Sequence, residues 1–286
     1  MIEKVAIGLT LGSAMLLSGP AEDATQIMRR AINRTEANWY AAPSYSFFRT
    51  KSKSKRGAQP VTVTQQVLMI DGSQYSKTVA EAGHPLAPAA AKQEEEKLRK
   101  EMSRRSKESP RERAQRLRKY AEDRERDHLL LTQLAEAFDY TFAANQQPAA
   151  NQQQVGPGAW VIEGHPKSGY IAPNRDAKVL SSMNIKIWVD KATYQWIRLE
   201  AEVTQPVALF GSLAKVSPGT RFTLEQEPVS QTVWLPKRFT MQVNASALGL
   251  LHEDFTEDEM YSNYLLANPL NETLAGEAPP KSVTLR

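Results

Sequence analysis

The pattern of hydrophobic and polar residues predicts a helix near the start of the chain. Between residues 24 and 40, apolar side chains recur at helical intervals, with arginines between them. Ile27, Ala31 and Ile32 lie on one side of such a helix, and Pro43 ends it. We expect an amphipathic helix with one buried face.

Alternating patterns predict antiparallel strands on both sides of a long polar segment. Asp71-Gly72 separates two extended runs, which is a strong signal of a β-hairpin. The expected strands cover residues 45–53, 61–70, 74–79, 138–142, 159–164, 220–225, 233–243 and 259–265, with a further hairpin over 184–203. Regular short strands separated by turns indicate one antiparallel sheet.

Residues 91–127 form a highly charged segment with 14 Lys or Arg against 10 Asp or Glu. The difference of +4 equals the net charge of the whole chain. Opposite charges four residues apart, such as Glu95 and Arg99, favour helices. The capping box that runs from Ser109 through Pro110 to Glu112 divides the segment into two helices, the first ending near Lys107. We expect a mostly solvated helical hairpin.

The first residues have the order of a secretory signal. Lys4 precedes an uncharged apolar run over residues 5–17, and small residues follow up to Ala21. The run is shorter than the roughly 20 residues that a membrane-spanning helix needs. A buried first helix or strand is the alternative. We expect export, with cleavage near Ala21, a mature domain over 22–267 and a tail over 268–286.

Composition leaves most classes of function open and narrows the compartment. The hydrophobic content of 41% and the charged content of 24% are ordinary for a globular protein, and the net charge of +4 does not require a nucleic-acid partner. The chain has no cysteine, so it forms no disulfide and carries no lipid on a cysteine. A bacterial periplasm fits this composition.

The sequence contains no recognisable catalytic or metal motif. The histidines at 84, 128, 165 and 252 lack metal-binding spacing, and no nucleophile elbow or phosphate loop is present. The acidic run 252–259 could bind a cation, but we favour an acidic surface loop. We therefore expect a protein without catalytic residues, metal or cofactor.

The charged hairpin could meet an anion, although its opposite charges largely cancel along each helix. Residues 111–119 are the exception, because their bases face a single acid, Glu112. The candidate residues for docking an anion or a partner are Arg111, Arg113, Arg116, Arg118 and Lys119. Elsewhere, Trp188 and Trp196 flank one hairpin turn and could either line a cavity or fill a core.

Three features together resemble the LolA-like superfamily of bacterial envelope proteins. They are the first amphipathic helix, the hairpin IWVDKAT(187–193) returning through WIRLEAE(196–202), and the strand VWLPKRF(233–239). The chain is also similar to exported bacterial proteins of unassigned function that carry a charged insert. The resemblance implies an α+β fold with a strongly curved antiparallel sheet, an open half-barrel whose apolar cavity is covered by helices. The implied cavity residues are Phe47, Val67, Ile187, Trp196, Leu199 and Phe239.

The charged insert, at about residues 88–128, departs from that family pattern and could be a lid, a docking arm or an ornament. The resemblance implies a non-catalytic periplasmic protein that binds a lipid, acyl chain or lipoprotein in envelope transport or sensing. Two alternatives stay open: an interaction module that docks an envelope protein through the hairpin, and an exported hydrolase. We expect a monomer with no nucleic-acid partner.

Overall fold

The structure is a computed structural model that describes residues 22–55, 58–144, 158–174, 176–209, 214–247 and 251–267. The expected signal segment 1–21, the polar segment 145–154 and the tail 268–286 lie outside the described residues. Their assignments, and the division of the chain that depends on them, stay predictions.

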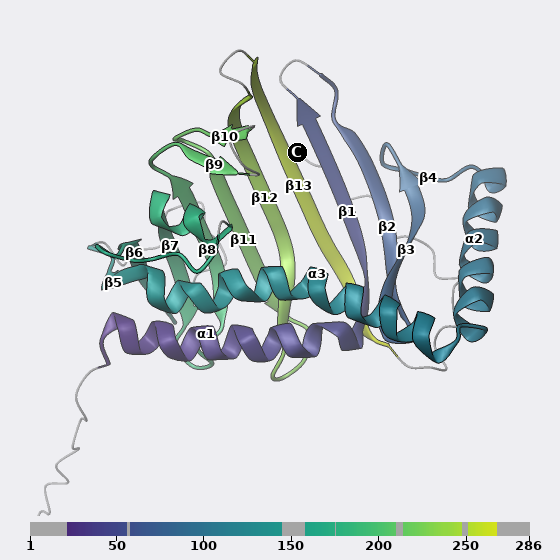
Figure 1. The fold of residues 1–286 in the computed structure, drawn as a ribbon, viewed down its shortest axis with the longest axis horizontal. Coiled ribbons are helices and arrows are strands. Elements are labelled where there is room, and N and C mark those ends of the chain that lie inside the picture. Colours follow the sequence, from purple (N-terminus) through teal and green to yellow (C-terminus); the bar gives the residue numbers. More distant parts are fainter. Residues whose placement is uncertain are drawn as a thin grey trace, which may run out of the picture.

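One open antiparallel sheet forms the body of the described chain (Figure 1). Its strands are β1 (Tyr45–Lys55), β2 (Val61–Ile70), β3 (Ser73–Glu81), β4 (His84–Pro85), β5 (Phe138–Phe142), β6 (Ala159–Pro166), β7 (Met183–Asp190), β8 (Trp196–Val203), β9 (Val207–Leu209), β10 (Ala214–Val216), β11 (Arg221–Pro228), β12 (Trp234–Ala247) and β13 (Leu251–Leu266). The order across the sheet is β4-β3-β2-β1-β13-β12-β11-β8-β7-β6-β5, and β9 and β10 attach beside β12. The expected open sheet with helices is confirmed.

Two long helices cross one face of the sheet near one end of its strands (Figure 1). The helix α1 (Ala24–Ala41) begins at a capping box of Asp23 and Gln26, and the short η1 (Ala42–Ser44) follows it. The helix α3 (Pro110–Ala137) runs beside α1, and a further short helix, η2 (Asp176–Ser182), packs near its end. We call the sheet face that α1 and α3 cover the inner face.

The main hydrophobic core lies between α1 and strands β6 to β8. Ile27 and Met28 of α1 and Ile162 and Ile187 of the sheet are fully buried. The predicted amphipathic helix is therefore confirmed, and its apolar stripe closes this half of the inner face.

The expected Asp-Gly hairpin connects β2 and β3. Asp71 has φ 45° and Gly72 has φ 83°, the two left-handed residues that a tight hairpin turn needs. Residues on either side pair directly, with Ile70 opposite Ser73. This turn points toward the charged helices.

The two predicted charged helices are α2 (Pro88–Ser106) and α3, which begins at the expected capping box of Ser109 and Glu112. They run in different directions (Figure 1), so the expected hairpin of two helices side by side is not formed. Lys77 of β3 contacts Glu95 of α2 at 2.6 Å, whereas the Tyr120 hydroxyl of α3 lies 3.9 Å from the sulfur of Met69. Lys77 pairs with Gln66, so it points to the side of the sheet opposite Met69. The two helices therefore hold the edge of the sheet from opposite faces.

Candidate functional site

One row of side chains crosses the inner face from core to edge. In an antiparallel sheet, directly opposed residues point to the same side. The row follows the strand register through Ile162, Ile187, Leu199, Leu224, Phe239, Glu259, Lys51 and Val63. It begins in the core under α1 and becomes charged where β13 meets β1.

The structure divides the predicted cavity residues between core and surface. Ile187 and Trp196 are buried in the core cluster, with Leu199 packed against it, so this group fills space under α1. Val67 is also buried and lies opposite the half-buried Phe47. The half-buried Phe239 continues the row toward β13. Ligand contact by any of them stays a prediction.

A cluster that we call the central ladder occupies the middle of the inner face. It consists of Lys51 and Lys53 on β1 and Glu257, Glu259 and Tyr261 on β13. The Lys51 ammonium lies 2.9 Å from Glu259 and also pairs with Glu257. The Tyr261 hydroxyl donates to Glu259 at 2.5 Å. The carboxylates are buried, with side chains 11% and 12% exposed, while the lysines are 44% and 48% exposed.

The ladder stabilises its own charged state. Burial alone would raise the pKa of Glu259, but hydrogen bonds from Tyr261 and Lys51 outweigh it and leave this pKa below its usual range. Burial would likewise lower the pKa of Lys51, and its two carboxylate partners raise it instead. Burial, helped by Glu259, raises the pKa of Tyr261. Lys51 and Glu259 therefore stay ionised as a pair near neutral pH.

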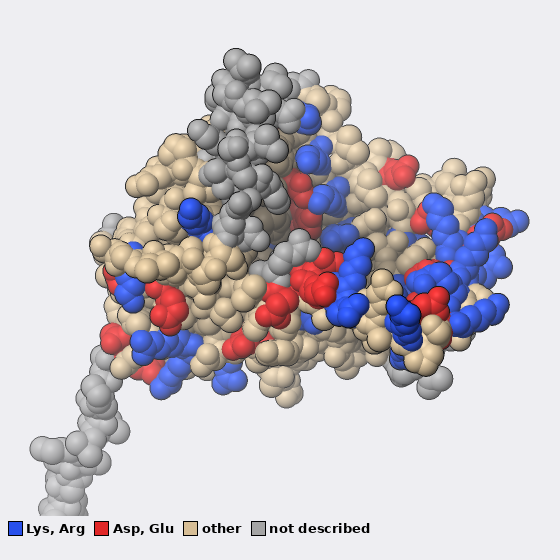
Figure 2. Space-filling view, in the orientation of Figure 1, with Lys and Arg blue, Asp and Glu red and all other residues tan. Residues whose placement is uncertain are grey.

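Apolar side chains flank the ladder on both sides. The Phe47 ring lies 5.8 Å from the Tyr261 ring and 5.2 Å from the Tyr264 ring. On β12, the half-buried Phe239 and Met241 face the same side. Figure 2 shows basic and acidic residues inside the hollow above the helices, where β1 and β13 run in Figure 1. The exposed inner face is thus a polar band between apolar margins.

The sequence does not predict this band, because the acidic run 252–259 resembles a surface loop. The loop assignment is wrong: β13 spans Leu251–Leu266, and Glu257 and Glu259 alternate onto the inner face opposite β1. Their burial is tolerated because Lys51 compensates the charge. The alternation of Lys51 and Lys53, matched by that of the two acids, was the available signal.

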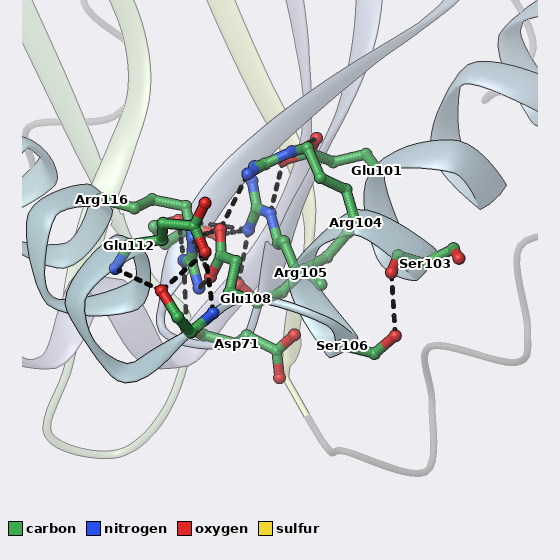
Figure 3. Close-up of polar contacts among 12 residues, drawn as sticks. Asp71, Glu101, Ser103, Arg104, Arg105, Ser106, Glu108, Glu112 and Arg116 are labelled. Atoms are coloured by element: carbon green, nitrogen blue, oxygen red, sulfur yellow. Dashed lines mark hydrogen bonds and ion pairs between the residues drawn. The ribbon is translucent and has the colours of Figure 1, made fainter.

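A second polar cluster, the clasp, holds the β2–β3 turn between α2 and α3 (Figure 3). The buried Arg105 of α2 donates to the Ile70 carbonyl at 2.6 Å and to the Ser73 carbonyl at 3.0 Å. Arg116 of α3 donates to the Asp71 carbonyl at 3.2 Å and to the Ser73 hydroxyl at 2.7 Å. These two arginines stabilise the packing of the insert against the sheet.

The predicted docking residues on α3 differ in their surroundings. Arg116 is 14% exposed and is also held by Glu108 at 2.8 Å, so its guanidinium belongs to the clasp. Arg111, Arg113 and Lys119 are exposed and make no ion pair within the described residues. Arg118 is 71% exposed, with Glu122 3.9 Å away. Docking through these residues stays a prediction.

The motif residues of the β7–β8 hairpin have local structural roles. Asp190 accepts hydrogen bonds from the Thr193 amide at 2.8 Å and from its hydroxyl at 2.7 Å, which closes the turn. Arg198 pairs with Glu200 at 2.7 Å and with Glu225 of β11. Trp188 is buried in a small cluster with Val161, so it fills a core.

Among the described residues, no three or more His, Asp or Glu side chains come together as a metal-binding group. None of the described helices has the length and apolar character needed to cross a membrane.

No family model matches the chain, and no curated protein matches it in sequence. Similar solved structures include a LolA superfamily protein from Nitrosomonas europaea, with 9% identity and a TM-score of 0.36, covering 87% of this chain and 95% of that one. A putative outer membrane lipoprotein-sorting protein domain from Vibrio parahaemolyticus has 12% identity and a TM-score of 0.34, with coverages of 86% and 95%. A DUF1329 family protein from Desulfovibrio piger has 10% identity and a TM-score of 0.34, with coverages of 88% and 97%. All three likenesses are at low sequence identity.

Proposed function

We propose that this chain is a non-catalytic binding protein of the cell envelope that holds an amphipathic ligand, such as a lipid or an acylated polypeptide, on its inner face. The observation that carries the proposal is the central ladder, a charged band set between apolar margins on the part of that face that α1 and α3 leave open. Such a surface matches a molecule with one polar and one apolar region.

The physical chemistry of the band assigns a role to each part. The two lysines present their ammonium groups toward the hollow, while the carboxylates beneath them are buried. An anionic or zwitterionic headgroup would gain charge-assisted hydrogen bonds from the lysines. An acyl chain would lie against Phe47 or Phe239, gaining about 25 cal/mol for each Å² of apolar surface removed from water.

The envelope location rests on the first residues and on composition. The apolar run after Lys4 has the order of an export signal, and the chain has no cysteine. A carrier or sensor of amphiphiles has its natural place in an aqueous compartment next to a membrane.

Mass spectrometry of the purified protein, under native conditions and again after organic extraction, tests this function. We expect a co-purifying lipid or acylated species that native spectra show bound to the folded protein. Protein that is free of ligand, and that stays free after incubation with envelope lipids, would contradict the proposal.

A matched pair of substitutions locates the site. Lys51 and Lys186 are both strand lysines, 44% and 40% exposed, and each lies 2.9 Å from a glutamate. Lys186 lies on the outer face, since its neighbour Ile187 is in the core. We expect Lys51→Gln to weaken binding of an anionic amphiphile about fivefold, equivalent to about 1 kcal/mol, and Lys186→Gln to leave it unchanged. Equal effects in a fluorescent fatty-acid titration would place the ligand elsewhere.

A further inference from the structure

In the charged insert formed by α2 and the start of α3, acidic and basic side chains point in different directions, although they alternate along the sequence. Four of its acids turn toward the sheet or the clasp. Glu94 accepts from the Thr78 amide at 3.1 Å, and Glu95 pairs with Lys77 at 2.6 Å. Glu101 pairs with Arg105 at 2.6 Å, and the 3% exposed Glu108 pairs with Arg116. These carboxylates are used in attaching the insert.

Most basic side chains of the insert are exposed to solvent. We call the basic face the exposed set formed by Lys92, Lys97, Arg99, Lys100, Arg104, Lys107, Arg111, Arg113, Arg118 and Lys119. Between residues 88 and 119 the exposed acids are Glu96 and Glu112, and Glu112 is occupied by the cap of α3 at Ser109. Figure 2 shows Lys and Arg gathered at the end of the molecule where α2 lies. The cancellation expected from the sequence is therefore incomplete at the surface. Three of these bases pair with acids, Lys97 with Glu94, Arg104 with Glu101 and Glu108, and Arg118 with Glu122. The other seven make no ion pair within the described residues.

The chemistry of this face indicates what it meets. The exposed large hydrophobic residues of the described chain all lie outside 88–119. Protein interfaces have an apolar or aromatic centre and are depleted in lysine, so this face lacks their signature. Long, flexible cationic side chains without an apolar anchor suit a flat surface with a high density of negative charge. An anionic bilayer is such a surface.

We propose that the basic face adsorbs to a membrane rich in anionic phospholipid. Adsorption through α2 and the start of α3 is electrostatic and reversible, without insertion of the helices. It is separate from ligand binding at the central ladder, which lies on the inner face of the sheet.

Vesicle sedimentation of the full chain tests the adsorption. The vesicles contain phosphatidylglycerol in phosphatidylcholine, with pure phosphatidylcholine as the reference for any binding through the apolar N-terminal run. We expect the protein to bind the anionic vesicles at 50 mM salt and to dissociate from them at 500 mM salt, because salt screens the attraction between the basic face and the anionic lipid. Equal binding to both vesicle types, or no binding, overturns the proposal.

Matched charge reversals locate the surface. The test variant combines Arg99→Glu, Lys100→Glu, Arg111→Glu and Arg113→Glu, positions whose side chains are exposed and make no hydrogen bond or ion pair within the described residues. The control variant changes net charge equally through Arg29→Glu, Arg34→Glu, Lys167→Glu and Lys178→Glu, which are also exposed. We expect the test variant to lose at least tenfold in affinity and the control to lose less than threefold.

The remaining outcomes also decide the question. Equal losses in the two variants would show that net charge alone causes binding, and this would overturn the basic face. If the test variant melts below the wild type, the same four positions changed to Gln replace it, and binding that they leave intact overturns the proposal. Preference for soluble polyglutamate over anionic vesicles would identify an acidic protein as the partner instead.

Discussion

Single residues in the clasp differ sharply in their energetic roles, as two neighbouring arginines show. Arg105 is buried and donates to backbone carbonyls of the β2–β3 hairpin. Arg104 is 54% exposed and pairs with Glu101 of α2 and with Glu108, which follows α2. Carbonyls that lose a buried donor are left without a partner, whereas a lost surface ion pair is replaced by water.

We therefore expect Arg105→Met to lower the free energy of unfolding by about 2–4 kcal/mol. Arg104→Met, the matched control, should change it by less than about 1 kcal/mol. Urea denaturation of both variants measures the difference. Similar losses in the two variants would show that Arg105 contributes only as a surface charge.

Glu101 makes the clasp sensitive to acid. Hydrogen bonds from Arg104, then from Arg105, outweigh burial and lower the pKa of Glu101 from 4.5 to about 2. A lowered folded pKa gives stability that is complete above the ordinary value and is lost as pH falls through the folded value. We expect wild type to melt above Glu101→Gln at pH 7, with the gap narrowing below pH 4.5 and closing near pH 2. A gap that is constant with pH in calorimetric scans would contradict this.

At the scale of elements, the β2–β3 turn is the point where the sheet meets the insert. A Cβ on Gly72 would lie 3.1 Å from Leu117 of α3, a tight contact. Gly83, in the equivalent position of the β3–β4 turn, has nothing within 4 Å. Both glycines have positive φ, 83° and 78°, so they share the same backbone cost.

Substituting each glycine by alanine separates packing from backbone strain. Gly83→Ala should cost about 1 kcal/mol through its left-handed backbone alone. Gly72→Ala should cost about 1 kcal/mol more, because Leu117 must move. Chemical denaturation gives both values, and equal costs would mean that α3 yields freely at this turn.

Helices and strands with a clear hydrophobic periodicity or a strong boundary signal were predictable from the sequence, whereas very short strands were not. The capping box at Ser109 and the Asp71-Gly72 turn each fixed a boundary that the structure confirms. Strands β4, β9 and β10 were missed because two or three residues are too few to show alternation. Their strand geometry comes from neighbours in the sheet.

At the scale of the whole molecule, the candidate site was only partly predictable. Ile187 and Phe239 do lie on one face of the sheet, as the family resemblance implied, whereas their role in ligand binding stays a prediction. The pairing of Lys51 with Glu259 was not seen, because it joins residues 208 positions apart. The exposure of the insert's basic side chains was also not predicted, since the spacing of charges along a helix does not show which side of the helix packs against the sheet.

The position of β13 determines when the sheet can be completed during folding. This last strand lies between β1 and β12, so it joins a sheet of β4 to β1 to a sheet of β12 to β5. Until β13 has been synthesised, no sheet hydrogen bonds join β1 to β12, and Lys51 has neither Glu257 nor Glu259 beside it. Because pairing between strands that are far apart in sequence slows folding, we expect the two parts of the sheet to join late, only once β13 is available.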